Sequence, residues 1–509
     1  MNRRIWLASL VCLAVVLGWI CLPAIHLGFV SDDFIHLSSD QHQPWYYSSD
    51  ALYRPLRNGF FKAAAGMWGT APEAYRALAW LMYSLCGLLL YRFSRQMGLS
   101  SAASLLAASL ALIYPKNDAL LFWFATFQDL VYVACVLVLL LCWIRFRKSA
   151  DEYGAPYFLA ILCFGLALGF KETAIMAPGL LLLVDWYLFE DRLRSDRLRT
   201  LLPYAGFIVP VLLFAIFVYW YPAGRFRMAA AQAQNATYGS SGIFGSVLAE
   251  MKGFLNMLLP WGENFALREV RGALLLKLIA SLTMLVALVF TTARKRLWIF
   301  ALIWILIALS PTSLFARGVS ADYYLFLANF ALAMAISSSL IDWGSRSPVF
   351  KFLLLLAGVA YFSSAARDLI RQRAEWHHAA LEVRRTVLAI ETVVPKDPQG
   401  PVDLIDVTHN LEGKPVLNNG LLGALLADGF NSHISILVTH KPTETPDAAD
   451  KALREAIASC QAKPETAAEN RSTRRYTVVI DPIRATIAPP ACASAIAEQD
   501  QQKRPEAWH

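Results

Sequence analysis

The sequence predicts an α-helical polytopic membrane protein of about eleven spans, followed by a small C-terminal α/β domain outside the cytoplasm. Of the 509 residues, 57% are hydrophobic and only 17% are charged, whereas about a quarter of a soluble protein is charged. Apolar runs of roughly 20 residues, long enough to cross a bilayer, recur along most of the chain. The net charge of +8 does not indicate nucleic-acid binding, because the basic residues gather in short clusters between these runs.

The apolar runs and the basic clusters together predict the topology. The spans are expected near 5–23, 74–92, 101–115, 126–145, 156–170, 173–190, 201–221, 272–291, 297–313, 322–341 and 350–365. Basic clusters precede the first span and follow every second one, so the positive-inside rule places them and the N-terminus in the cytoplasm. The start of the chain is typical of a signal peptide, but no small-residue cleavage site follows, and we expect an uncleaved first span. An odd number of spans places the tail outside.

Two long loops fall on the outer side, near 24–72 and 222–271. Each contains an amphipathic stretch, Gly59 to Gly69 and Ile243 to Leu259, that is typical of a helix lying in the membrane plane. Helices of this kind would wall a cavity that opens to lipid.

The composition turns soluble from about Glu375. Three predicted strands alternate with two predicted helices, at 402–407, 418–428, 434–439, 447–460 and 475–480. This alternation predicts a small α/β domain, so we expect a transmembrane domain over 1–370 and an extracytoplasmic domain over 371–509. Cys460 and Cys492 lie in this tail, where they either form a disulfide or stay apart, because spacing alone does not decide between the two.

Asp32 and Asp33 directly follow the first span. A charge beside a membrane helix is costly unless it faces water, a cation or a reacting group, so the pair is either a solvated helix exit or a catalytic carboxylate. Adjacent side chains point in different directions on a helix or strand, and we expect only one of them to face a cavity. His36 and His42 add nitrogen donors, so a divalent metal is possible, although the spacing matches no zinc motif.

Sugar transfer from a lipid phosphate needs a base for the acceptor and cations for the leaving phosphate. Five cations at the outer ends of spans are candidates: Arg54, Arg57, Lys116, Lys171 and Arg317. Each is either a phosphate partner or an interfacial anchor that snorkels to water.

Asp118 and Asp129 are two further acidic candidates near the outer face. On a continuous helix they would lie roughly 16 Å apart, so both cannot touch one small group. Asp129 is either paired within a helix contact or part of the site.

The order of several short motifs suggests a family. They are the acidic pair, Tyr53-Arg-Pro-Leu56, Tyr114-Pro115 with Trp123 and Asp129-Leu130, Lys171-Glu172, Leu258-Leu-Pro260, Asp322-Tyr-Tyr-Leu-Phe-Leu327 and Trp376. In this order, residues 1–380 resemble the GT-C superfamily of integral-membrane glycosyltransferases. The likeness is to bacterial relatives of the protein O-mannosyltransferases and of the tetratricopeptide-coupled transmembrane mannosyltransferases.

The resemblance implies transfer of a sugar from a polyprenyl-phosphate donor to an envelope glycan, lipid or protein outside the cytoplasm of a bacterial inner membrane. It implies inversion at the anomeric carbon, with Asp33 or Asp32 as the base. Tyr53, Arg54 and Lys171, with the adjoining Glu172, would line the region of the donor phosphate.

The chain departs from the family pattern at two motifs. Relatives often have His-Pro at the place of Tyr114-Pro115 and Glu-Arg at the place of Asp322-Tyr323, so Arg317 is the candidate to replace the missing Arg. The chain also has no tetratricopeptide array.

Two other classes of function remain open. A transporter or lipid-linked glycan flippase predicts charges at mid-membrane and paired repeats, whereas the charges here crowd at outer span ends. A non-catalytic scaffold would use its tail to bind a partner. Changing Asp32 and Asp33 to Asn distinguishes a glycosyltransferase from a transporter and from a scaffold, because only the enzyme would lose sugar transfer.

Overall fold

The computed structural model describes residues 15–39, 54–149, 153–191, 200–220, 251–257, 272–313, 322–394, 396, 402–407, 410–411, 414–417, 424–425, 436–440, 476–480 and 485–487. Its contacts divide the chain into two units. The first comprises Met1–Ile25, Trp45–Phe60 and Glu73–Arg373, and the second comprises His26–Pro44, Phe61–Pro72 and Ala374–His509. The predicted division at 370/371 remains a prediction.

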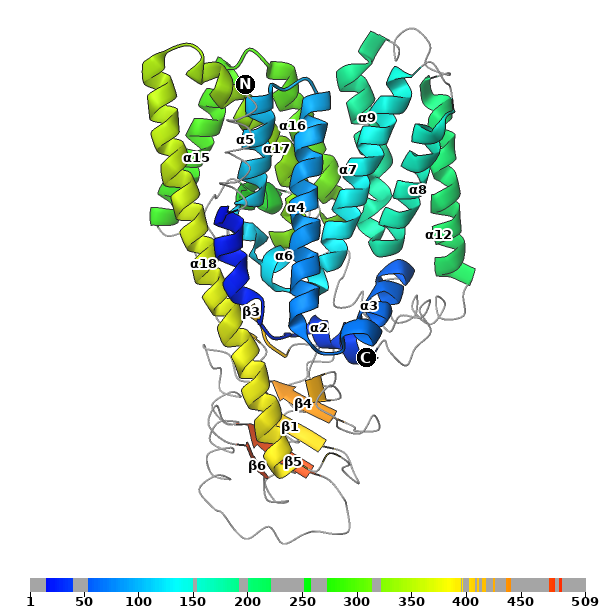
Figure 1. Ribbon diagram of the computed structural model, residues 1–509, viewed down its shortest axis with the longest axis vertical. Coiled ribbons are helices and arrows are strands. Elements are labelled where there is room, and N and C mark those ends of the chain that lie inside the picture. The colour runs from blue at the N-terminus through cyan, green and yellow to red at the C-terminus, as the bar shows by residue number, and fades with distance from the viewer. Residues whose placement is uncertain are drawn as a thin grey trace. The chain divides into compact units, whose positions relative to one another are not determined.

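The first unit is helical throughout its described part (Figure 1). Its α-helices are α4 (Pro72–Gln96), α5 (Ser101–Leu112), α6 (Asp118–Phe122), α7 (Phe127–Lys148), α8 (Ala155–Phe170), α9 (Ala177–Leu188), α12 (Ile208–Trp220), α15 (Gly272–Thr291), α16 (Lys295–Ser313) and α17 (Leu325–Gly344). Shorter turns of other helix types join them: η1 (Leu22–Ala24), η3 (Pro115–Asn117), η4 (Phe124–Thr126), η5 (Glu172–Met176), η6 (Leu202–Phe207) and η8 (Asp322–Tyr324).

The helices pack in two neighbouring groups within this unit. α7 packs against α8 and α9, and α17 packs against α5 and α16. The predicted spans from 74–92 to 350–365 each overlap one of the helices, as expected of apolar runs of this length. In the described part of the chain, four helices are long and apolar enough to cross a membrane, and the bent pair α5 and α6 would make a fifth. The count of about eleven spans stays a prediction.

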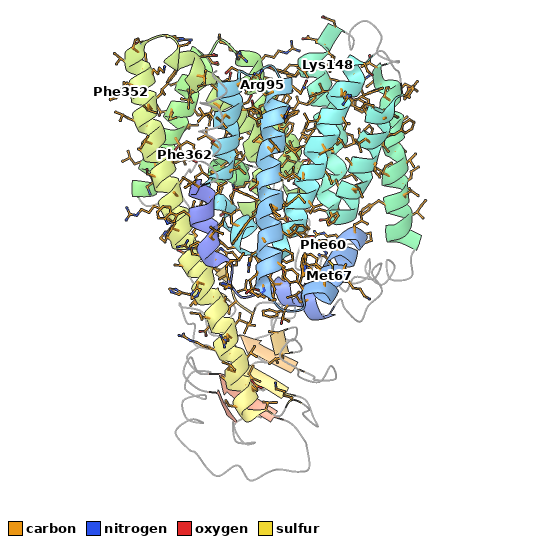
Figure 2. All side chains as sticks on the ribbon, viewed as in Figure 1. Phe60, Met67, Arg95, Lys148, Phe352 and Phe362 are labelled. Atoms are coloured by element: carbon orange, nitrogen blue, oxygen red, sulfur yellow. The ribbon has the colours of Figure 1, made fainter. Side chains whose placement is uncertain are left out.

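Large apolar side chains cover the outside of these helices. Phe352, for example, points outward (Figure 2) and is 59% exposed. α8, α12 and α15 expose Leu and Ile side chains in the same way. A soluble protein rarely exposes so much contiguous apolar surface, whereas lipid is a suitable solvent for it, so the chain is a membrane protein.

The segment from α5 to α7 is broken twice. The pieces Ser101–Leu112 and Pro115–Phe122 meet at 57°, and the chain is extended at Trp123 before η4 begins. Carbonyl groups freed by these breaks accept hydrogen bonds from α4: Arg76 donates to Phe122 O, Trp80 to Leu121 O and Tyr83 to Leu112 O. Backbone groups inside a bilayer must be satisfied by protein, so α4 stabilises the break.

A buried ion pair joins α7 and α9 near the C-terminal ends of these helices. Asp185 accepts hydrogen bonds from Trp143 at 2.9 Å, Arg147 at 2.6 Å and Tyr204 at 2.8 Å. Arg147 also lies 4.4 Å from the centre of the Trp143 ring. These contacts fix α7, whose opposite end carries Asp129.

Helix α18 (Pro348–Val393) is longer than the sequence predicts. At 46 residues it spans about 69 Å, more than twice the roughly 30 Å hydrocarbon core. The predicted span ends at 365, where apolarity falls, but no Pro or Gly interrupts the chain between Gly358 and Pro395. Buried Val383, Val387 and Ile390 recur at helical spacing, which continues the helix through a charged sequence.

The second unit contains a four-stranded sheet of order β4-β1-β5-β6. Its strands are β1 (Val402–Val407), β4 (Ile436–His440), β5 (Tyr476–Ile480) and β6 (Ala485–Ile487). β1 is parallel to β4 and β5, with Val402 opposite Ile436 and Tyr476, and β6 is antiparallel to β5. β1, β4 and β5 overlap the three predicted strands. The helices predicted over 418–428 and 447–460 lie outside the described residues except for 424–425, so the α/β character remains a prediction.

Five further elements belong wholly or partly to the second unit. α2 (Asp32–Phe34) continues into η2 (Ile35–Ser39), and β2 (Asn410–Leu411) pairs with β3 (Lys414–Pro415). α3 (Pro55–Trp68) confirms a helix where the sequence predicts one over 59–69, and its place in the membrane plane stays a prediction. Of the second such stretch, residues 251–257 are described and are helical.

Candidate active site

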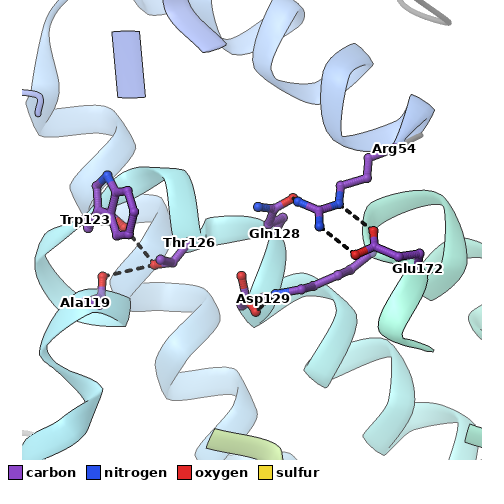
Figure 3. Close-up of polar contacts among 8 residues, drawn as sticks. Arg54, Ala119, Trp123, Thr126, Gln128, Asp129 and Glu172 are labelled. Carbon is purple, nitrogen blue, oxygen red and sulfur yellow. Dashed lines mark hydrogen bonds and ion pairs between the residues drawn. The ribbon is translucent and has the colours of Figure 1, made fainter. Parts of the chain in front are cut away.

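Arg54 and Glu172 form a bidentate ion pair in the first unit. Arg54 Nε and Nη2 donate to the two carboxylate oxygens of Glu172 at 2.6 and 2.7 Å, and Nη1 donates to Gln128 Oε1 at 3.0 Å. Figure 3 shows the guanidinium fork facing the carboxylate. Arg54 precedes α3, Gln128 lies in the first turn of α7, and Glu172 begins the turn between α8 and α9. Three segments distant in sequence therefore meet at one guanidinium.

The neighbouring residues Lys171 and Asp129 form a second ion pair. Both side chains are almost wholly buried, at 1% and 2% exposure. The Lys171 ammonium lies 4.2 Å from the ring centre of Tyr324 and 5.1 Å from that of Tyr323, within the range of cation–π attraction. Asp129 Oδ1 meets Lys171, while its Oδ2 is buried without a hydrogen-bond partner in the described part of the chain.

Both members of the first pair stay charged. Burial raises the pKa of Glu172, but the adjacent guanidinium of Arg54 outweighs burial and lowers that pKa to about 2. Burial also acts to lower the pKa of Arg54, and Glu172 outweighs it, so the pKa of the guanidinium lies above its ordinary value. The charges of Arg54 and Glu172 therefore balance each other, so a new anion must replace the Glu172 carboxylate or bind beside it.

Three other predicted residues are buried in the first unit. Arg57 is 2% exposed and donates to Asn58 Oδ1 at 2.9 Å. Lys116 lies in η3 and Asp118 begins α6, and they are 1% and 5% exposed. Burial this deep does not fit the interpretation of Arg57 and Lys116 as anchors that snorkel to water.

The helix between Asp118 and Asp129 is not continuous. α6 ends at Phe122 and α7 begins at Phe127, and Thr126 Oγ1 donates to Ala119 O at 3.0 Å across the break (Figure 3). The separation expected for an unbroken helix therefore does not apply to this pair.

The second unit contains the acidic pair in a tight turn over residues 30–33, the acidic turn. The Asp33 N–H donates to Val30 O at 3.1 Å, and Ser31 has φ 46° and ψ −121°. These are the features of a type II′ turn, whose second position favours Gly. A Ser in this conformation costs about 1–3 kcal/mol.

The two carboxylates of the acidic turn have different surroundings. Asp33 is 1% exposed, and its Oδ2 accepts a hydrogen bond from the Val30 N–H at 3.1 Å. Asp32 is half-buried, and its Oδ1 lies 3.4 Å from Ser31 Oγ. The turn therefore fixes the orientation of Asp33 and leaves Asp32 nearer the surface, as expected for adjacent side chains.

His36 is buried and stacks on Phe61, with ring centres 4.3 Å apart. In the described part of the chain, no three His, Cys, Asp or Glu side chains gather closely enough to hold a metal ion. His42, the fourth donor of the predicted set, is not among these residues, so the divalent metal stays a prediction. Five predicted residues lie outside the described residues: Tyr53, Arg317, His42, Cys460 and Cys492.

Sequence reasoning missed three residues that contact the candidates or the acidic turn. Gln128 binds Arg54, and its only sequence signal is its place beside Asp129. Tyr324 covers Lys171, although its motif was noted only as part of a resemblance. Val416 accepts a hydrogen bond from the Ser31 N–H at 2.7 Å, and no signal in the sequence points to it.

Comparison with known proteins supports the resemblance. The family model for dolichyl-phosphate-mannose-protein mannosyltransferase matches residues 58–220. A crystal structure of ArnT from Cupriavidus metallidurans bound to undecaprenyl phosphate aligns with 98% of this chain and 95% of its own, with a TM-score of 0.52 and 14% identity. The same protein in the apo state aligns with 96% of this chain and 94% of its own, with a TM-score of 0.50 and 13% identity.

Archaeal oligosaccharyltransferase AglB from Archaeoglobus fulgidus, in complex with an inhibitory peptide and a dolichol-phosphate, aligns less well. It covers 79% of this chain and 62% of its own, with a TM-score of 0.47 and 14% identity. No curated protein has a significantly similar sequence. On the family model and the two ArnT structures, the chain resembles the GT-C glycosyltransferases, as its motifs predict, and has the fold of ArnT.

Proposed function

We propose that this protein transfers a sugar from a polyprenyl-phosphate donor to an envelope glycan, lipid or protein acceptor at the periplasmic face of a bacterial inner membrane. The buried Arg54–Glu172 and Lys171–Asp129 pairs carry this proposal. Buried charges are costly and are rare among apolar helices unless they serve a function. Two cations that are each paired with a carboxylate are suited to bind a phosphate, because the phosphate can take the place of the carboxylate.

The guanidinium of Arg54 is the group that would bind the donor phosphate most directly. A phosphate oxygen pair fits the same fork that now binds the two oxygens of Glu172. Lys171 would add a point charge, supported by the faces of Tyr323 and Tyr324. As the bond to the sugar breaks, negative charge grows on the phosphate, and fixed cations stabilise that charge. Arg57, Asp118, Tyr53 and Arg317 remain proposed substrate contacts.

We assign the base to Asp33 rather than Asp32, because Asp33 is buried and held by the Val30 N–H. The Asp33 carboxylate would accept the proton of the acceptor hydroxyl or amine. The acceptor lone pair would then form a bond to the anomeric carbon. The bond from that carbon to the phosphate oxygen would break with its electron pair, which releases polyprenyl phosphate and inverts the carbon.

The proposed topology has about eleven spans, a cytoplasmic N-terminus, a transmembrane domain over 1–370 and a periplasmic α/β domain over 371–509. Basic clusters such as Arg145 to Lys148 support it through the positive-inside rule.

The experiment measures turnover by purified protein in nanodiscs, with a panel of polyprenyl-phosphate sugars and envelope acceptors. Mass spectrometry of released polyprenyl phosphate is the readout. We expect release by the wild type, loss of release in Asp33→Asn and a smaller decrease in Asp32→Asn. Asp342→Asn is the matched control, because that carboxylate pairs only loosely with Arg294, at 3.9 Å.

Normal turnover by folded Asp33→Asn would overturn the assignment of the base. No release from any donor, with intact protein and a panel verified on another enzyme, would favour the flippase or scaffold instead.

A further inference from the structure

The strained residue of the acidic turn depends on the C-terminal part of the chain. Ser31 is the one non-glycine residue with a positive φ in the described ranges. Its N–H donates to the carbonyl oxygen of Val416 at 2.7 Å. A bond this short to a backbone carbonyl holds the residue in a conformation that Ser rarely adopts alone.

The residues around Val416 are themselves fixed. We call Lys414 to Leu417 the 414–417 segment. Val416 and Leu417 are buried, and Lys414 of β3 lies opposite Leu411 of β2 in the two-stranded sheet. A buried and hydrogen-bonded segment opens less readily than a solvated loop, so the Val416 carbonyl is a suitable anchor for a turn.

Helix α18 anchors the 414–417 segment. Lys414 Nζ lies 3.4 Å from Glu375 Oε2 and 5.4 Å from the ring centre of buried Trp376. The same helix also approaches the chain just before the turn, because a Cβ added at Gly28 would lie 3.6 Å from Ala380 Cβ. One helix therefore supports both the segment and the entry to the acidic turn.

We propose that the 414–417 segment positions Asp33 for proton transfer by holding the acidic turn in its strained form, a role that rests on the proposed function of Asp33 as base. The hydrogen bond to Val416 fixes Ser31, the turn places the Asp33 carboxylate above the Val30 N–H, and that N–H orients the carboxylate. Lys414 is then a positioning residue, which acts on the Asp33 carboxylate through Val416 and Ser31 and does not touch the reacting atoms.

The test uses Lys414→Met in the full chain. We expect kcat to fall about tenfold, equal to about 1.4 kcal/mol, while KM for the donor stays unchanged, because the base is misplaced and the donor contacts are intact. Hydrogen exchange of the amides over residues 30–34 should be faster. Lys396→Met is the matched control, because it removes a Lys–Glu pair with Glu391 at 2.8 Å and should change neither readout.

A rescue experiment separates positioning from general stability. Ser31→Gly removes the strain, so turnover of Lys414→Met should recover when Ser31→Gly is added. Ser31→Ala keeps the Cβ and should not restore it. If Lys414→Met does not fold, Lys414→Glu with Glu375→Lys restores the ion pair with reversed charges and should recover both exchange protection and turnover relative to Lys414→Glu alone.

Each outcome decides the proposal. Unchanged exchange over 30–34 in Lys414→Met would overturn the contact, and equal rescue by Gly and Ala would overturn the role of strain. Faster exchange with unchanged kcat would overturn positioning. A wild type without turnover would refute the proposed function, and the exchange data, which need no activity, would still decide whether the segment holds the turn.

Discussion

Breaking the Arg54–Glu172 pair should cost much more stability than breaking an exposed pair with a similar distance between its charged atoms. Arg54→Gln or Glu172→Gln leaves one buried charge without its partner, which costs about 3–5 kcal/mol. The double variant leaves two amides that can bond to each other. The sum of the stability losses in the two single variants should therefore exceed the stability loss in the double variant.

The size of this coupling follows from the ionisation of Glu172. Its pKa falls from an ordinary 4.5 to about 2, and one pKa unit corresponds to about 1.4 kcal/mol. The folded surroundings thus favour the carboxylate by about 3 kcal/mol, even after the cost of burial. Both side chains are mostly shielded from water, at 7% and 19% exposure, so solvent screens the pair little.

The assay is a double-mutant cycle on the free energy of unfolding, from reversible SDS titration in mixed micelles followed by tryptophan fluorescence. The control cycle uses Arg296 and Glu190, whose charged atoms lie 2.7 Å apart but whose side chains are 43% and 28% exposed. An exposed pair contributes less than about 1 kcal/mol. A coupling below 1 kcal/mol at Arg54–Glu172, or equal couplings in the two cycles, would refute the reasoning.

Two further predictions concern stability. The pKa of Glu172 is lower in the folded than in the unfolded chain, so its stabilising effect is complete above about pH 4.5 and is lost as the pH falls toward 2. Between pH 6 and 2.5 the free energy of unfolding of the wild type should therefore fall by about 2.5 kcal/mol more than that of Glu172→Gln in the same titration. Parallel curves for the two proteins would contradict this. A Cβ at Gly206 would lie 2.1 Å from Tyr157 Oη, which donates to Pro203 O, whereas a Cβ at Gly66 in α3 would meet open space. Gly206→Ala should therefore destabilise by about 1–3 kcal/mol and Gly66→Ala should stabilise by up to about 1 kcal/mol, and changes of one sign at both positions would count against the packing described here.

The sequence was sufficient to predict where the helices lie, because an apolar run of membrane length has few other structures open to it. It was insufficient where a helix continues without apolarity. α18 passes through Arg371, Arg373 and Glu375 because a narrow stripe of buried side chains supports it, and a hydropathy window averages over such a stripe. The sequence predicts that one span ends near 115 and the next begins near 126, but it does not place the break at Trp123, because the α4 donors that satisfy the freed carbonyls cannot be paired with them from sequence.

The candidate cations could be named from sequence, but their partners could not. Arg54 and Glu172 are 118 residues apart, and nothing local to either residue indicates the other. The sequence likewise left Asp32 and Asp33 equivalent. They differ because Ser31 adopts a positive φ, a choice made by a hydrogen bond to Val416 that no local pattern encodes.

The dependence of the broken α5–α6 segment on α4 has a consequence for biosynthesis. Arg76, Trp80 and Tyr83 supply donors to carbonyls that lipid cannot satisfy, so the bent segment is poorly suited to remain in the bilayer alone. The ribosome delivers the chain from its N-terminus, so α4 leaves the exit tunnel before the bent segment does. The order of the helices along the chain therefore places the hydrogen-bond donors of α4 ahead of the bent segment that needs them. The bent segment does not have to wait in the translocon for its partner to be synthesised.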